Sequence, residues 1–117
     1  MGIRKMVGRL TKPIEDADRE ELQAYCSLVN ATPLDEIVLR APGRYVGEIR
    51  SIRIVPRAGA DALEVAFTDG RSLATAVFLG RRKIAGLTPG RRMLVEGVPG
   101  TDNGRTVIVN PVYTLLT

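Results

Sequence analysis

The stretch that decides the fold covers residues 44–55 and reads Arg-Tyr-Val-Gly-Glu-Ile-Arg-Ser-Ile-Arg-Ile-Val. Its apolar side chains change phase, because Tyr45 and Ile49 share one parity whereas Ile52 and Ile54 share the other. Successive side chains of a strand point to opposite faces, so a regular strand cannot bury both pairs on one face. The phase change predicts a long strand with a β-bulge between these pairs, bent so that it can serve two sheets.

Four further strand segments follow, separated by turn residues. In the first of them Leu63, Val65 and Phe67 share one parity, and Asp69-Gly70 then provides a hairpin turn. A Pro-Gly and an Asp-Asn-Gly sequence bound the later segments. The five strands are expected at Arg44–Val55, Leu63–Thr68, Arg71–Leu79, Arg91–Val98 and Arg105–Val109.

The segment before these strands has helical rather than alternating periodicity. Apolar side chains recur at steps of three and four in residues 3–14, and a second helix is expected to begin at Asp18. The buried face of that second helix is predicted at Leu22, Tyr25, Cys26 and Val29. An Ala-Pro-Gly sequence marks a boundary, so we expect a helical extension at residues 1–39 and a β domain at residues 40–117.

The net charge of +4 hides an uneven distribution. Residues 1–12 carry four basic residues and no acidic one, a net of +4, whereas residues 13–39 carry seven acidic residues against one basic residue, a net of −6. Residues 40–117 carry twelve basic residues against six acidic ones, a net of +6. A basic β domain is typical of proteins with a polyanionic partner.

The residue types that are missing exclude several chemistries. The chain has no His and a single Cys. Without His there is no Ser-His-Asp triad, no Cys-His pair and no His-ligated metal, and one Cys forms neither an internal disulfide nor a Cys₄ site. We therefore expect a protein that is not an enzyme, with no catalytic residue, no metal and no cofactor.

The hydropathy pattern gives no sign of a membrane anchor. The longest unbroken apolar run is Ala76 to Leu79, whereas a membrane-spanning helix needs about 20 apolar residues. The first residues are basic but lack the apolar core of a signal peptide. The sequence therefore predicts a protein with no integral membrane segment, located in the cytoplasm.

Five short strands, a bent first strand and a connector between the third and fourth are the plan of an OB-fold barrel. Short motifs occur in the matching order. They are Val46-Gly47-Glu48-Ile49, Val65-Ala66-Phe67-Thr68-Asp69-Gly70, Val77-Phe78-Leu79-Gly80, Leu94-Val95-Glu96-Gly97-Val98 and Asn110-Pro111-Val112-Tyr113. Over about residues 44–116 the chain resembles small actinobacterial OB-fold proteins and is similar to the wedge domain of branch-migrating helicases. The resemblance implies an all-β, five-stranded OB-fold barrel behind an N-terminal helical extension, and nucleic-acid binding as its frequent use.

OB-folds bind strands across the face of their second and third strands, next to the loops after the first and fourth. Single-strand binding needs cations for phosphates and flat groups for stacking, and arginine suits both. The candidate nucleic-acid-binding residues are Arg53, Arg57, Arg71, Phe78, Arg81, Arg82, Lys83 and Arg105. If Val77 and Leu79 point inward, Phe78 points outward and offers a stacking platform, and otherwise Phe78 belongs to the core.

These features predict non-catalytic binding of single-stranded DNA or RNA with little sequence readout. The alternative is a protein-interaction or regulatory adaptor that uses the barrel as a scaffold. In that interpretation the apolar stripe of the first helix contacts a protein partner or a second copy of the chain. The stripe consists of Ile3, Met6, Val7 and Leu10.

Overall fold

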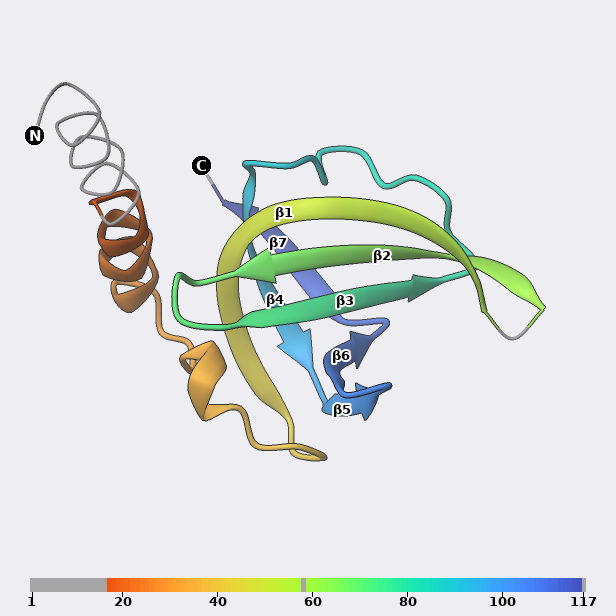
Figure 1. Cartoon of the computed structure of the whole chain (residues 1–117), viewed down its shortest axis with the longest axis horizontal. Helices are drawn as coiled ribbons and strands as arrows, with labels where there is room; N and C mark the ends of the chain where they lie inside the picture. The colour runs from red at the N-terminus through yellow and green to blue at the C-terminus, as the bar shows by residue number, and fades with distance from the viewer. Residues whose placement is uncertain (1–16, 58, 117) are drawn as a thin grey trace, which may run out of the picture.

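The computed structural model describes residues 17–57 and 59–116, which form a mostly β protein with one helix (Figure 1). Residues 17–27 are helical, and a 3₁₀ turn, η1 (Leu34–Glu36), leads into the sheet. Seven strands follow within the described part of the chain. They are β1 (Gly43–Arg57), β2 (Ala60–Thr68), β3 (Leu73–Leu79), β4 (Arg92–Gly97), β5 (Pro99–Asp102), β6 (Arg105–Val109) and β7 (Val112–Leu116).

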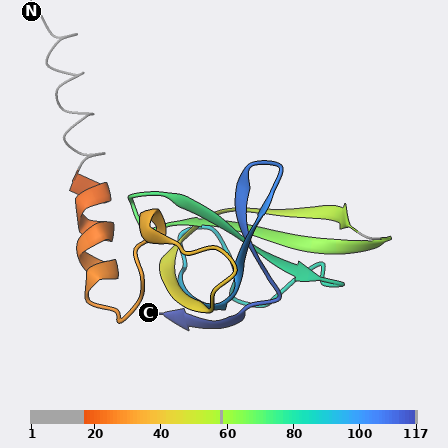
Figure 2. The same cartoon turned by 90° about the horizontal axis from the view of Figure 1, so that it is seen from below.

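All seven strands belong to one sheet in the order β5-β6-β3-β2-β1-β4-β7. Neighbouring strands are antiparallel except for β3 and β6, which are parallel. β4 and β5 are separated by Val98 alone, although β4 pairs with β1 and β5 pairs with β6. The sheet therefore curls strongly around its core, as the view from below shows (Figure 2).

The predicted bulge in the first strand is confirmed. Ile49 pairs with Phe67 and Ser51 pairs with Ala66, so Arg50 is the extra residue on β1. β1 pairs with β4 over residues 43–48 and with β2 over residues 48–57, so the bulge lies just after the pairing with β4 ends. The bulge thus turns one strand from one side of the curled sheet to the other.

Strands occur at all five expected segments, but the sheet has seven strands rather than the expected five, because β5 and β7 are added within the described residues. Because proline has no N–H to donate, the fourth strand breaks before Pro99, and the chain then re-enters the sheet as β5. The turn from β5 to β6 uses Asn103 (φ 52°) and Gly104 (φ 78°), the backbone region that the Asn-Gly pair of a tight hairpin favours. After Pro111 the chain forms β7, which pairs with β4.

The main core lies on the concave side of the sheet. Its largest members include Tyr45, Ile49, Phe67 and Met93, each at most 2 % exposed. Ile54 departs from the expected pattern and is 47 % exposed, although its partner on β2, Leu63, is buried in the main core. Burial of this apolar surface supplies most of the driving force for folding.

The helix packs on the sheet beside the β2–β3 turn, where Gln23 donates a hydrogen bond to the Gly70 carbonyl, and its predicted buried face points inward. Leu22 and Cys26 are buried against Val46 and Leu94, and Tyr25 is partly buried beside them. Burial raises the pKa of the Cys26 thiol to about 11. The helix already includes residue 17, so Asp18 lies within the helix and is not its first residue.

The apolar stripe of the expected first helix lies outside the described residues, as do all of residues 1–16. Among the helical residues that the structure describes, no segment is long and apolar enough to span a membrane.

Candidate nucleic-acid interface

A groove crosses the outer face of β1, β2 and β3, opposite the core. Its middle is formed by Ser51, Ala66, Ser72 and Leu73. One end reaches Glu64, Thr75, Gly104 and Arg105, and the other end reaches the helix and the β2–β3 turn. We call this surface the groove below.

Strand alternation explains which side chains face the groove. On β2, Leu63, Val65 and Phe67 enter the core, so Glu64 and Ala66 point to the other side. The bulge reverses the parity of β1, which brings Ser51 opposite Ala66 and Arg53 opposite Glu64. Small side chains at adjacent positions of three strands leave the hollow between the charged ends.

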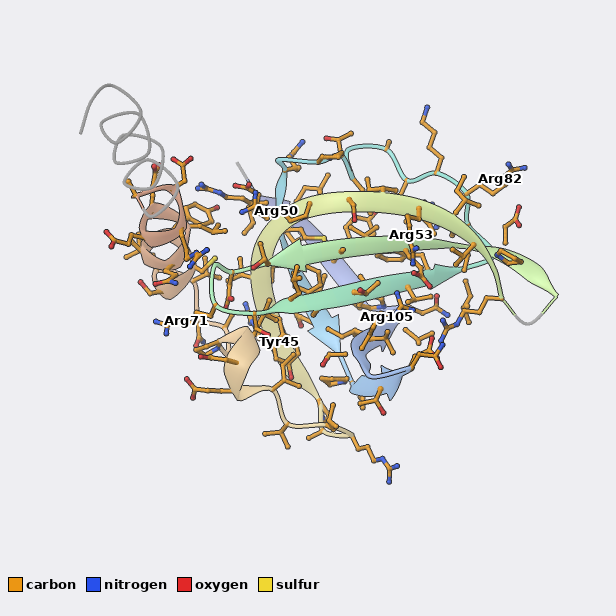
Figure 3. The ribbon with its side chains drawn as sticks, viewed as in Figure 1. Tyr45, Arg50, Arg53, Arg71, Arg82 and Arg105 are labelled. Atoms are coloured by element: carbon orange, nitrogen blue, oxygen red, sulfur yellow. The ribbon has the colours of Figure 1, made fainter. Side chains whose placement is uncertain are left out.

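Five arginines line the groove: Arg19, Arg50, Arg53, Arg71 and Arg105. Arg50 and Arg71 lie toward its helix end, and Arg53 and Arg105 lie farther along β2 and β3 (Figure 3). The sequence predicted Arg53, Arg71 and Arg105 but missed the other two. Arg50 is the bulge residue, so its direction depends on tertiary pairing, and Arg19 is a single base inside an acidic segment.

Glu64 gathers the arginines at the far end of the groove. Its Oε1 accepts hydrogen bonds of 2.9 Å from Arg53 and 2.9 Å from Arg105, and Arg105 also reaches Oε2 at 3.4 Å. Arg57 Nη1 lies 3.7 Å from Oε2 and bonds Asp102 at 2.9 Å. Hydrogen bonds from Arg105 above all, and then from Arg53, lower the pKa of Glu64 although burial opposes them.

The helix end of the groove is organised differently. Glu48 accepts from Arg50 at 3.1 Å and from Arg92 at 3.4 Å, and the Arg92 guanidinium lies over the Tyr25 ring at 4.2 Å. This chain of contacts links the helix to the arginine that the bulge presents. Arg71 is exposed on the turn before β3, whose backbone is held by Asp69 Oδ1.

Phe78 is not a stacking platform, so this predicted site residue is wrong. It is 5 % exposed, belongs to the main core, and meets the Tyr113 ring edge-on at 5.6 Å between centroids. Val77 is also buried, in a small cluster with Ala62 and Val107 on the outer face. Because both faces of β3 are covered, the apolar neighbours of Phe78 gave no indication of which face was the core.

The basic run after β3 does not join the groove. Arg81, Arg82 and Lys83 are all exposed, and none lines the groove. Arg82 instead pairs with Asp61 at 3.3 Å, away from Arg53 and Arg105 (Figure 3). Arg57 is likewise absent from the groove lining, although its guanidinium forms an ion pair with Glu64.

The groove thus offers guanidinium, hydroxyl, carboxylate and backbone groups and no aromatic ring among its described lining residues. Tyr45, Phe67 and Phe78 are buried in the core. In the part of the chain that the structure describes, no cluster of three or more acidic or Cys side chains could hold a metal ion. Five arginines against two carboxylates, Asp18 and Glu64, leave the groove lining with an excess of positive charge.

No protein-family model matches the chain, and no curated protein matches it.

Proposed function

We propose that this chain is an OB-fold protein that binds single-stranded nucleic acid in the groove without catalysis. The strand pairing supports the OB-fold. β1 pairs with β2 and β4, and β3 runs parallel to β6, which are the pairings of a five-stranded Greek-key barrel if β4 and β5 count as one broken strand. β7 is then an addition to that barrel at the edge of β4.

The observation that carries the function is the arginine-lined groove on the β2–β3 face. Guanidinium groups bind phosphate through paired N–H donors, and five of them line the groove. Ser51, Ala66 and Ser72 lie beside the exposed Leu73 in the middle of the groove, and these three small side chains leave room for an extended backbone to approach the sheet. Contacts to phosphates carry no sequence information, which favours binding with little sequence preference.

The test is fluorescence anisotropy with labelled single-stranded DNA, single-stranded RNA and duplex DNA at several salt concentrations. Affinity for the single strands should fall steeply with salt, because phosphates bound by arginine release counterions. Absence of binding to all three probes near physiological salt would contradict the proposal.

A matched pair of variants locates the site. The double variant Arg50→Ala/Arg71→Ala removes two charges from the groove, and Arg81→Ala/Lys83→Ala removes two charges outside it. We expect the first to weaken binding at least about tenfold and to reduce the salt dependence, and the second to change affinity by less than about threefold. Equal losses in both variants would show that general charge attraction, not the groove, binds the strand.

A further inference from the structure

Glu64 is buried beneath two exposed guanidinium groups. The Glu64 side chain is 5 % exposed, whereas those of Arg53 and Arg105 are 62 % and 37 % exposed. The carboxylate comes from the middle of β2, and the two arginines reach it from β1 and β6 on either side. A buried carboxylate therefore holds two arginine heads at the surface of the groove.

The hydrogen bonds to Glu64 use the edges of the guanidinium groups. All N–H donors of arginine lie in the guanidinium plane, and Arg105 directs two of them to the two Glu64 oxygens. Bonds made in that plane leave the flat faces for stacking, the second way in which arginine recognises nucleic acids. Fixing the planes in advance lowers the entropy lost on binding.

Charge at this end of the groove is already largely balanced. Arg53, Arg57 and Arg105 contact Glu64 and Asp102, so three cations face two anions. A phosphate that captured Arg53 and Arg105 would have to displace these bonds and leave a buried carboxylate without partners, which is costly. A nucleobase that stacks on the guanidinium faces leaves the bonds intact.

We propose that Arg53 and Arg105 form a stacking platform for nucleobases, with Glu64 as the positioning residue that holds it. This inference rests on the proposed function and divides the groove in two. Phosphates bind at the helix end, near Arg19, Arg50 and Arg71, and bases stack at the Glu64 end. The platform takes the place of the aromatic rings that the groove lining lacks, and it selects single strands because bases in a duplex are already stacked.

The experiment compares two single-stranded probes at equal length, about 15 nucleotides, which one OB-fold accommodates. The first probe is oligothymidine, and the second carries abasic residues with the same phosphates. The wild-type protein should bind oligothymidine at least about tenfold more tightly, as expected from one or more stacked bases. Equal affinity for the two probes overturns the platform but leaves the proposed function intact, whereas absence of binding to both overturns the proposed function itself.

The variant Arg53→Lys/Arg105→Lys keeps both charges and removes both planes. We expect it to lose the preference for oligothymidine over the abasic probe while the salt dependence stays the same. The control Arg81→Lys/Arg82→Lys makes the same exchange outside the groove and should keep the preference. If Arg53→Lys/Arg105→Lys keeps the full preference for oligothymidine over the abasic probe, the platform is contradicted.

Glu64→Gln tests the positioning role with a different readout. If Glu64 orients a stacking platform, the variant loses part of the preference for oligothymidine, and its affinity for the abasic probe stays the same. If Glu64 only masks phosphate-binding arginines, the variant binds both probes more tightly and with a steeper salt dependence. The second result overturns the proposal.

Discussion

Arg105 at the start of β6 forks onto Glu64 in the middle of β2, although β3 lies between the two strands. The small outer-face side chains explain this reach. Opposite Ala66, β3 carries Thr75, and Val77, the β3 partner of Glu64, is buried with Ala62 and Val107. One ion-pair cluster therefore ties together β1, β2 and β6.

Glu64→Gln should destabilise the protein by about 1 kcal/mol at neutral pH, a modest value because Arg53 is mostly exposed to solvent. The same substitution at Glu96 of β4 serves as the control and should cost little. Urea denaturation gives both values. A variant at Glu64 as stable as the wild type would show that the cluster contributes nothing to folding.

The ion-pair cluster also predicts an acid dependence of stability. Arg105 and Arg53 lower the pKa of Glu64 below its ordinary value of 4.5, so the folded state favours the ionised form. The resulting stabilisation is fully present above the unfolded-state pKa and is lost as the pH falls through the lower folded-state pKa. Between neutral pH and pH values below 4.5, wild-type protein should therefore lose more free energy of unfolding than Glu64→Gln. Parallel losses would contradict the assignment.

Gly47 on β1 approaches its neighbouring strand too closely for any side chain. A Cβ there would lie 2.7 Å from the Thr68 carbonyl oxygen and 2.8 Å from Phe67 Cδ2. Gly47→Ala should cost about 1–3 kcal/mol, because the backbone must shift. At Gly100 of β5 a Cβ meets no described atom within 4 Å, so Gly100→Ala is the matched control and should be nearly neutral in thermal denaturation.

Phe78→Leu separates a core residue from a binding residue. We expect a loss of about 1 kcal/mol or more in the free energy of unfolding, because the smaller side chain leaves space beside Tyr113. The affinity for oligothymidine should not change at a temperature where the variant is folded. A weaker complex with unchanged stability would restore Phe78 as a contact residue.

The docked helix can be followed through the thiol of Cys26, which is 9 % exposed and has a pKa raised to about 11. Native protein should therefore react slowly with a thiol reagent at neutral pH. Leu22→Ala removes a side chain that is 2 % exposed and should speed labelling at least about tenfold by loosening the helix. Leu28 follows directly after the helix and is 87 % exposed, so Leu28→Ala should leave the rate unchanged.

The sequence by itself determined the local elements, because alternation and turn chemistry act over a few residues. The bulge in β1 follows from the phase change around Arg50. The turns at Asp69-Gly70 and Asn103-Gly104 follow from residues that tolerate positive φ. The buried face of the helix follows from the spacing of Leu22 and Cys26. The five expected strands all occur for the same reason.

Only the tertiary structure decided the site. Which arginines meet depends on the pairing of β1 with β2 and of β3 with β6, and these pairings join residues far apart in the sequence. The direction of the Phe78 side chain depends on which elements cover the two faces of β3. The position of the Arg105 guanidinium depends on the carboxylate of Glu64, which lies on another strand. Charge counts locate a basic domain, but ion pairs formed across strands determine which of those charges are balanced in the folded protein.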